Sequence, residues 1–452
     1  MNIVEEALKY TTDTKACVIA ADGVESSAKM FAGLFPDAKR VLLVADPRTF
    51  DVAGRRVTDL LVQGRVTVYR YLFGEDGLPF HAEYKWIERL REAYRQLFPN
   101  EIVPMVAVGS GTVNDIVKRT SEEVGCRYMV VGTAASMDGY TSSGAAITKD
   151  GMKQTLACKA PLGCIVDSRI AAAAPKEMVA SGYADLLAKI PAGADWILAD
   201  AIGAEAIHQE AWNFVQGPLR DSLSNPEGAA SGDIAETEKL CSGLVMSAFA
   251  MQAMNSSRPA SGTEHQVSHY WDMEDLCFNG QPVSHGFKVG IGTLVSTKTI
   301  EFLLKQDLAN LDVEAAVAKW WPDFETVAAT FPKVFGDRPA HINRARGEYP
   351  KKFPTRDQLR AELNLVKSKW PELSAKMKAQ LMPFEEVREK LRKVGAPYEP
   401  EMIGVSRARF RETYAGVPYM RARYFSLDLV DRLGLTNSLL DELFGPGGVW
   451  AI

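Results

Sequence analysis

The stretch MVAVGSGTVNDIVKRT, residues 105–120, passes from an apolar strand pattern through a Gly-Ser-Gly turn at 109–111 into a helical pattern. Glycines at a strand-to-helix turn let a phosphate approach the backbone, and the start of a helix offers free N–H groups and a positive dipole. Thr112 could cap this helix and donate to the same phosphate. The third glycine of the usual dinucleotide fingerprint is missing, because Asn114 stands in its place. Taken alone, the motif fits a tight turn as well as it fits a phosphate cradle.

Around this stretch, short apolar runs alternate with segments of helical periodicity such as WIERLREAYRQLF. Strands are predicted at residues 16–20, 40–46, 65–72, 102–109, 127–133 and 164–170. Runs that are apolar throughout suit strands buried on both faces of a parallel sheet, and their spacing indicates βαβ units. Beyond Pro175 the pattern is mostly helical. We therefore predict an α/β N-terminal domain, 1–172, with a doubly wound, mostly parallel sheet, followed by an all-helical domain, 173–452.

Composition narrows the function classes. The 452 residues carry a formal net charge of −5, with 46% hydrophobic and 24% charged residues, as expected of a folded globular protein. A mildly acidic chain gives no reason to expect a nucleic-acid partner, and no run reaches the roughly 18 apolar residues of a membrane span. The six cysteines lack zinc-site spacing, and the first residues are acidic where a signal peptide is basic. We expect a cytoplasmic protein.

Histidine is scarce, with six in the whole chain, yet three of them stand close together: His265, His269 and His285. His265 and His269 are four residues apart and would share one face of a helix. The pattern differs from the HExxH of zinc proteases, because Glu264 precedes the first histidine. Single histidines are usually surface or core residues, whereas for such a cluster a metal or catalytic site is about as expected as that ordinary placement.

A metal held by two imidazoles commonly takes a carboxylate as its third ligand. Asp185 is the best candidate, since it lies on the apolar face of the first helix of the predicted helical domain, and buried acids are rare unless they are paired or metal-bound. Lys189 is expected one turn further along on the same face. Asp195, in the same stretch, is expected at the surface.

Two further acidic residues follow predicted strands. Asp138 lies in a loop rich in Ser, Thr and Gly, where it could bind a polyol hydroxyl or serve ordinary turn chemistry. Asp46 ends the strand at 40–46, where it could accept from a ribose hydroxyl or cap the helix that follows. A carboxylate there disfavours a 2′-phosphate, but Arg48 could accept one. The choice between NAD and NADP therefore stays open.

Five segments in this order resemble one known family: GSGTVNDIVK, VGTAASMDGYTSSGAAIT, SGYADLLAKIPAGADW, SGTEHQVSH and SHGFKVGIGT. They are similar to the sn-glycerol-1-phosphate dehydrogenases, within the superfamily of iron-containing alcohol dehydrogenases, glycerol dehydrogenases and dehydroquinate synthases. The likeness covers nearly the whole chain. It implies a dehydroquinate synthase-like fold, an NAD or NADP cofactor, one divalent metal ion (Zn²⁺, Ni²⁺ or Fe²⁺) and a homodimer.

The resemblance also implies roles for individual residues. Asp185, His265 and His285 match the metal ligands, His269 matches a substrate-side histidine, and Asp138 matches a substrate-binding carboxylate. The matches to cofactor contacts are Asp46 at the ribose, Gly109, Ser110, Gly111, Thr112 and Asp115 at the pyrophosphate, and Thr133, Ser136 and Ser142 around the nicotinamide.

The activity implied by the resemblance is reversible reduction of dihydroxyacetone phosphate to sn-glycerol 1-phosphate, with the metal acting as a Lewis acid. His269 would relay the proton, and Arg258 and Lys189 are candidates to bind the substrate phosphate. Two alternatives stay open. One is a glycerol or polyol dehydrogenase with an unphosphorylated or a different phosphorylated substrate, and the other is a dehydroquinate-synthase-like cyclase.

Overall fold

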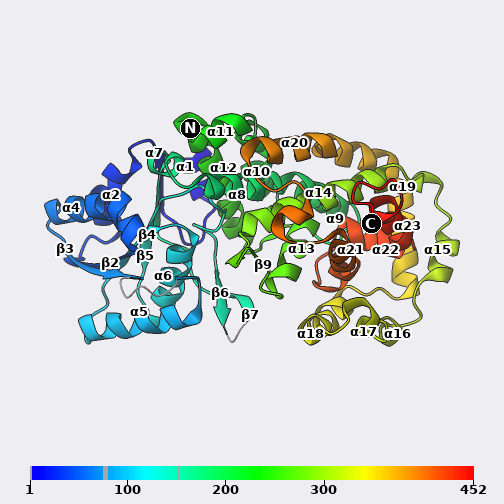
Figure 1. Ribbon diagram of the computed structural model, residues 1–452, viewed down its shortest axis with the longest axis horizontal. Helices are drawn as coiled ribbons and strands as arrows, with labels where there is room; N and C mark the ends of the chain where they lie inside the picture. Colours follow the sequence, from blue (N-terminus) through cyan, green and yellow to red (C-terminus); the bar gives the residue numbers. More distant parts are fainter. Residues whose placement is uncertain (1–2, 75–79, 150–151) are drawn as a thin grey trace. The chain divides into compact units, whose positions relative to one another are not determined.

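The computed structural model describes residues 3–74, 80–149 and 152–452, and Figure 1 shows their helices and strands. Six parallel strands form one sheet in the order β1-β8-β5-β4-β2-β3. Their bounds are β1 Ala16–Ala20, β2 Arg40–Ala45, β3 Thr67–Leu72, β4 Met105–Gly109, β5 Tyr128–Gly132 and β8 Gly163–Asp167. The order departs from the order along the chain, as in a doubly wound sheet. The predicted α/β fold class is thus confirmed.

Burial along the strands follows their place in the sheet. Every residue of β4, β5 and β8 is buried, and so is all of β2 after its first residue. The edge strands β1 and β3 are only half-buried or exposed. Inner strands covered on both faces need apolar side chains on both faces. This requirement explains why the inner strands read as continuous apolar runs in the sequence.

Helices cover both faces of this sheet (Figure 1). On one face, α2 (Ser27–Leu34) and α4 (Arg55–Gln63) share a hydrophobic cluster with alternate residues of β2, β4 and β5. On the other face, α6 (Gly111–Val124) packs on β4 and against α5 (Tyr84–Leu97). The amphipathic pattern of α5 buries Trp86, Ile87, Leu90 and Tyr94, which lie three or four residues apart.

Two local predictions for this part of the chain were wrong. The strand predicted at 164–170 ends at Asp167, because the Asp167 carboxylate accepts from the N–H groups of Arg169 (3.1 Å) and Ile170 (3.0 Å) and starts helix α7 (Ser168–Ala172). The end of the segment VGTAASMDGYTSSGAAIT, expected as the Ser-, Thr- and Gly-rich loop around Asp138, forms part of β6 (Ala145–Lys149), which pairs antiparallel with β7 (Met152–Leu156). Only alternate residues of β6, Ala145 and Ile147, are buried, so this strand lacks the long apolar run of an inner strand.

The remainder of the chain is mainly helical. Short helices α1 (Ile3–Leu8) and α3 (Pro47–Thr49) precede it, and one two-residue hairpin, β9 (Cys277–Phe278) with β10 (Gln281–Pro282), interrupts it. Its α-helices are α8 Lys176–Leu187, α9 Lys189–Ala201, α10 Gln209–Ser222, α11 Pro226–Ser231, α12 Ile234–Met254, α13 Thr263–Asp272, α14 His285–Leu304, α15 Val313–Lys319, α16 Phe324–Ala328, α17 Phe331–Phe335, α18 Pro339–Glu348, α19 Arg356–Gln380, α20 Phe384–Val394, α21 Arg407–Gly416, α22 Ser426–Arg432 and α23 Thr436–Phe444.

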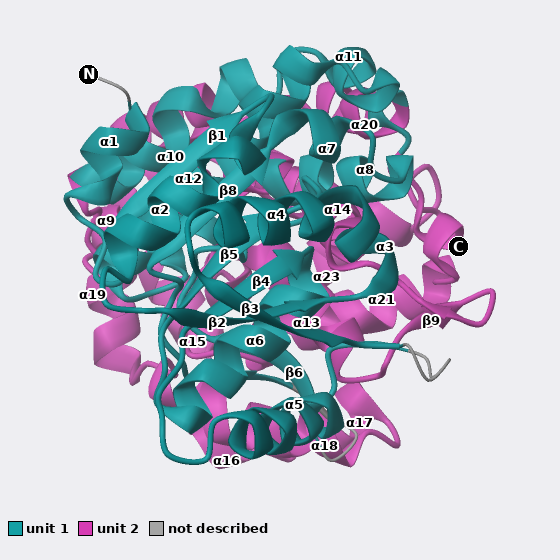
Figure 2. Cartoon of the chain, turned by 90° about the vertical axis from the view of Figure 1, so that its left-hand side faces the viewer, with its two compact units in different colours: residues 1–186, 210–260, 393–395 teal, residues 187–209, 261–392, 396–452 magenta. Residues whose placement is uncertain are grey.

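The contacts group the chain into two compact units, coloured separately in Figure 2. The first comprises residues 1–186, 210–260 and 393–395, and the second comprises 187–209, 261–392 and 396–452. The first unit thus holds the sheet together with α10 to α12. The division into domains 1–172 and 173–452 marks where the parallel sheet ends and remains a proposal. Within the described ranges, no helix combines the length and the apolar character that crossing a membrane requires.

Candidate metal and cofactor site

The Gly-Ser-Gly turn joins β4 to α6. Gly109 ends the strand, Ser110 occupies the N-cap position and Gly111 begins the helix. A Cβ at Gly109 would lie 2.7 Å from Val113 side-chain atoms, so the close return of the chain excludes larger residues there. Thr112, predicted as the cap, lies one residue inside the helix instead. Among the described residues, the Ser110 side chain makes no capping hydrogen bond, so the first N–H groups of α6 are not satisfied by that hydroxyl.

Three residues predicted to contact the cofactor make hydrogen bonds within the protein. The Thr133 N–H donates to the Gly109 carbonyl oxygen at 3.2 Å, which brings the chain after β5 next to the turn. The Asp115 carboxylate accepts from the N–H of Ala146 at 3.1 Å. Asp46 caps α3, because its Oδ1 accepts from the Thr49 N–H at 3.0 Å and its Oδ2 from the Thr49 hydroxyl at 2.9 Å. The capping alternative for Asp46 is therefore observed, while its ribose contact stays a prediction.

Two other predicted contacts lie in the loop after β5. The carbonyl oxygen of Ser136 accepts from the Ser181 hydroxyl at 3.2 Å. The Ser142 hydroxyl donates to the Gly139 carbonyl oxygen at 3.1 Å, and Ser142 is half-buried. These contacts tie the loop to α8 and to itself. The predicted contacts of both serines with a nicotinamide remain predictions.

Three side chains that sequence reasoning assigned to a metal converge in space. Asp185 on α8, His265 on α13 and His285 at the start of α14 each offer a ligand atom, and these atoms all lie within 4.8 Å of one another. Asp185 is fully buried and His265 is 6% exposed. One carboxylate and two imidazoles form a donor set typical of a three-ligand divalent metal site that leaves a position open for substrate.

Each of these three side chains also makes a polar contact with a neighbouring residue. Asp185 Oδ2 accepts from the Asp138 N–H at 3.0 Å. His265 Nδ1 lies 2.8 Å from Glu264 Oε1, and His285 Nδ1 lies 3.5 Å from the Ser268 hydroxyl oxygen. A histidine that gives its Nδ1–H to a carboxylate presents the lone pair of Nε2 to a metal. Glu264 therefore orients His265, a role that the sequence analysis did not assign.

Asp138 itself lies beside this group. Its Oδ2 accepts from the Ser247 hydroxyl of α12 at 2.9 Å, while its backbone N–H faces Asp185. The sequence analysis offered a polyol contact or turn chemistry for Asp138. The structure brings Asp138 and Asp185 together, and the substrate contact stays a prediction.

His269 is the accessible histidine of the cluster. Its side chain is 46% exposed, and its ring centroid lies 6.4 Å from those of both His265 and His285. Its Nδ1 lies 3.5 Å from Asp272, and the opposite Asp272 oxygen pairs with the buried Lys288 ammonium at 2.5 Å. Asp272 follows His269 by three residues, a helical spacing readable in the sequence. Lys288 lies beyond the β9–β10 hairpin, and only folding brings it to Asp272.

The two predicted phosphate contacts are both buried. Lys189 has no exposed surface, and Arg258, in the 3₁₀ turn Arg258–Ala260, is 1% exposed. The predicted helical continuity between Asp185 and Lys189 was wrong, since α8 ends at Leu187 and Lys189 begins α9. A buried cation needs anionic or polar partners. The phosphate role of both residues remains a prediction.

Asp195 was predicted at the surface, and this prediction was wrong. The residue is fully buried on α9, where its Oδ2 accepts from the Thr263 N–H (2.8 Å) and hydroxyl (2.9 Å) and its Oδ1 from the Ser426 N–H (2.7 Å). Burial, and then the nearby charge of Glu264, raise the pKa of Asp195. Because Thr263 opens α13 and Ser426 opens α22, the carboxylate ties three helices together. Partners so distant in the chain leave no local signal.

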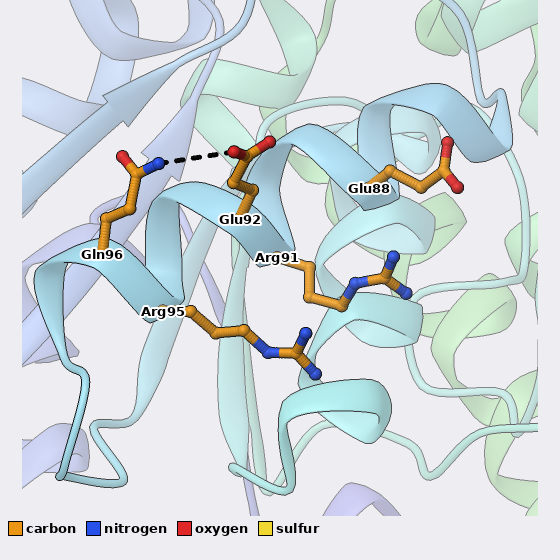
Figure 3. A pocket seen from close by; sticks show the side chains of 5 residues that line it. All are labelled: Glu88, Arg91, Glu92, Arg95 and Gln96. Carbon is orange, nitrogen blue, oxygen red and sulfur yellow. Dashed lines mark hydrogen bonds between the residues drawn. The ribbon is translucent and has the colours of Figure 1, made fainter.

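A shallow hollow on α5 contributes nothing to this group. As Figure 3 shows, it is lined by Glu88, Arg91, Glu92, Arg95 and Gln96, and Glu92 accepts a hydrogen bond from Gln96. Arg91 also pairs with Glu123 of α6. The Glu92–Gln96 contact is exposed, the Arg91–Glu123 pair is half-buried, and none of the lining residues belongs to the proposed site.

Comparison with known proteins supports the family resemblance of the five sequence segments. Residues 18–175 match the family model described as iron-containing alcohol dehydrogenase. The chain is 36% identical over 257 residues to a glycerol-1-phosphate dehydrogenase (NAD(P)+) of Geobacillus thermodenitrificans, an alignment that covers 56% of this chain and 62% of that relative. It is 31% identical over 278 residues to a glycerol-1-phosphate dehydrogenase (NAD(P)+) of Pyrococcus furiosus, covering 62% of this chain and 76% of the relative.

Solved structures show the same fold. The structure of a probable glycerol dehydrogenase from Sinorhizobium meliloti matches with a TM-score of 0.58 and 16% identity, covering 94% of this chain and 97% of that one. The fold and the family match define the class: a metal-dependent, NAD(P)-linked oxidoreductase of the iron-containing alcohol dehydrogenase type. Within that class, the chain belongs to the glycerol-1-phosphate dehydrogenase family. The family resemblance drawn from the five sequence segments is confirmed.

Proposed function

We propose that this enzyme reduces dihydroxyacetone phosphate to sn-glycerol 1-phosphate, reversibly, with NADH or NADPH as the hydride donor. The observation that carries the proposal is the convergence of Asp185, His265 and His285, one carboxylate and two imidazoles, in a chain of this family. Family membership supports a phosphorylated three-carbon substrate, and the ligand set supports carbonyl chemistry.

The donor atoms suit one divalent ion, Zn²⁺, Ni²⁺ or Fe²⁺, because imidazole nitrogen binds all three and the carboxylate adds a hard oxygen. Asp185, His265 and His285 would hold the ion. When bound, it supplies Lewis-acid polarisation of a carbonyl oxygen. Glu264 fixes the ring of His265, and the Asp138 N–H fixes Asp185, so the ligand atoms are oriented before any ion arrives.

The proposed cofactor contacts begin at the start of α6. The backbone of Gly109, Ser110, Gly111 and Thr112 would receive the pyrophosphate, where free N–H groups and the helix dipole favour an anion. When bound, the nicotinamide supplies the hydride. The remaining proposed contacts are Asp46 at the ribose, Asp115 near the turn, and Thr133, Ser136 and Ser142 around the nicotinamide.

On the substrate side, His269 is proposed to hand a proton to the developing alkoxide. It is the exposed member of the histidine cluster, and Asp272 holds its Nδ1 side. Asp138 would orient a substrate hydroxyl. Lys189 and Arg258 would neutralise the substrate phosphate, since buried cations gain most from an anionic partner.

Oxidation of NADH and of NADPH with dihydroxyacetone phosphate tests the proposal, measured before chelation, after chelation and after metal add-back. We expect turnover that disappears on chelation and returns with metal. Equal rates with unphosphorylated dihydroxyacetone would instead identify a polyol dehydrogenase. Release of inorganic phosphate without net cofactor turnover would identify a cyclase. Absence of turnover with either cofactor in the metal-replete protein would refute this substrate.

We further propose a homodimer that acts in the cytoplasm, as the family resemblance implies. Size-exclusion chromatography with light scattering would then give a mass near twice the 49.6 kDa of one chain. A mass of one chain at micromolar concentration would contradict the dimer. Fractionation of cells that make the protein would test the location.

A further inference from the structure

Helix α6 carries a lysine that is fully buried. The Lys118 ammonium donates to the carbonyl oxygens of Gly139 (2.9 Å) and Gly144 (3.0 Å) and lies 3.3 Å from Asp115 Oδ1. Its side chain has no exposed surface. A lysine ammonium has three donors, and these three acceptors use all of them. Burying an ammonium costs free energy unless it is paired and hydrogen-bonded. These contacts therefore offset the cost of burying the Lys118 charge.

Asn114, one turn earlier on α6, reaches the same part of the chain. Its amide nitrogen donates to the carbonyl oxygens of Gly139 (3.4 Å) and Tyr140 (3.3 Å), while its Oδ1 accepts from the Tyr128 hydroxyl at 3.1 Å. Asn114 is fully buried as well. Two polar side chains of one helix face therefore hold the backbone of residues 138–146, which we name the clamped segment.

The clamped segment leads directly to a proposed metal ligand. At its start, the Asp138 N–H donates to Asp185 Oδ2 at 3.0 Å. At its end, the Ala146 N–H donates to the carboxylate of Asp115, the ion-pair partner of Lys118. The helix that supplies both clamps begins at the Gly-Ser-Gly turn. One helix thus starts at the proposed cofactor turn and also fixes the loop that contacts Asp185.

We propose that Lys118 and Asn114 are positioning residues that set the metal affinity of the enzyme through the clamped segment. They hold Gly139, Tyr140 and Gly144 so that the Asp138 N–H stays on Asp185. That hydrogen bond orients the carboxylate and removes one of its free rotations. The inference rests on the proposed function, because it takes Asp185 as a metal ligand.

The test measures Zn²⁺ affinity by competition with a chelating indicator, with no substrate or cofactor present. Lys118→Met keeps an unbranched apolar chain of nearly the same length and removes the ammonium with its donors. Outer-shell changes at metal sites typically cost about 10- to 100-fold in affinity, and we expect a loss in that range. Lys29→Met, at an exposed position of α2, is the matched control and should bind Zn²⁺ like the unaltered protein.

Hydrogen exchange separates positioning from a general loss of stability. In folded Lys118→Met, amides of the clamped segment should exchange faster while those of β4 and β8 keep their rates. Zn²⁺ affinity equal to that of the unaltered protein, or exchange that is faster throughout the first unit, would overturn the proposal. Should Lys118→Met fail to fold, Asn114→Ala replaces it, with a smaller loss of affinity expected, and an unchanged affinity again counts against positioning.

A wrong assignment of the metal site would give a different result from a failure of the positioning role. If His285→Ala binds Zn²⁺ as tightly as the unaltered protein, the metal site itself is misassigned. Exchange of the clamped segment in Lys118→Met then still decides whether Lys118 holds this loop.

Discussion

Two buried carboxylates near the histidine cluster have different partners. Asp195 accepts from Thr263 and Ser426, whereas Glu264 accepts from the Gly262 N–H at 2.6 Å and faces His265. A Cβ at Gly262 would lie 2.7 Å from one Asp195 oxygen and 2.8 Å from Glu264 Oε2, so the two acids approach each other around that glycine. Glu264 Oε2 has no hydrogen-bond partner among the described residues. Two such charges repel in a low-dielectric interior, and a cation held by His265 would offset this cost.

Glu264→Gln should separate metal binding from stability. The amide keeps the shape but is a weaker acceptor for the His265 Nδ1–H, so we expect about 10-fold or greater loss of Zn²⁺ affinity. The metal-free protein should unfold at the same temperature or higher, because the repulsion with Asp195 is removed. Indicator competition and thermal unfolding measure the two effects. Glu92→Gln, on the exposed face of α5, is the control, and equal Zn²⁺ affinity in both variants would refute the orienting role.

His285→Ala should remove metal and activity together. Loss of one of three ligands abolishes tight binding, and Lewis-acid stabilisation worth several kcal/mol corresponds to about a 1000-fold or larger fall in kcat/KM. Metal content per chain and turnover are measured on the same sample. His81→Ala, at an exposed position, should change neither. An active, metal-replete His285→Ala protein would remove His285 from the site.

At the scale of elements, the β4–α6 unit concentrates the proposed chemistry. The strand is buried on both faces; it pairs with β2 over Met105–Ala107, and its end at Gly109 is fixed in the sheet by pairing with Gly132 of β5. The first turn of α6 directly follows the strand and is held in place by it. The second and third turns of the helix carry Asn114 and Lys118. A rigid strand followed by a helix therefore positions both the turn and the clamped segment.

Gly109→Ala should weaken cofactor binding. The added Cβ would meet Val113 at 2.7 Å, closer than side-chain atoms normally approach, so the turn must shift. We expect at least a 10-fold increase in the Kd for NADH, followed by fluorescence titration, with Zn²⁺ affinity little changed. Gly33→Ala on α2, where a Cβ meets nothing within 4 Å, is the control. Undiminished NADH binding in Gly109→Ala would remove the turn from the proposed cofactor site.

At the scale of the whole molecule, metal binding should stabilise the fold. The three proposed ligands come from three helices, and an unfolded chain cannot present them together, so the ion binds the native state preferentially. At free Zn²⁺ about 100 times its Kd, the free energy of unfolding should rise by about 2.7 kcal/mol. Thermal unfolding with and without chelator measures this. The same addition should leave His285→Ala unchanged, and a metal-independent unfolding temperature in the unaltered protein would argue against the site.

Much of the fold could be predicted from the sequence because its signals are local. Inner strands such as β4 and β5 are buried on both faces and so appear as unbroken apolar runs. The hairpin β6–β7 escaped prediction because β6 is buried on one side only, at Ala145 and Ile147, and so forms no continuous apolar run. The end of β8 was misplaced because a side-chain cap at Asp167, and not hydrophobicity, stops the strand.

The sequence by itself determined the parallel α/β sheet, the glycine turn and the identity of the side chains that converge: one carboxylate and two imidazoles, with a third histidine nearby. Only the tertiary structure decided how these groups are held. Asp195 is buried, Glu264 faces His265, and Lys118 binds two carbonyl oxygens more than twenty residues away. The physical reason is that residue type and spacing report on local hydrophobic burial, whereas hydrogen bonds between distant segments exist only once the chain has folded.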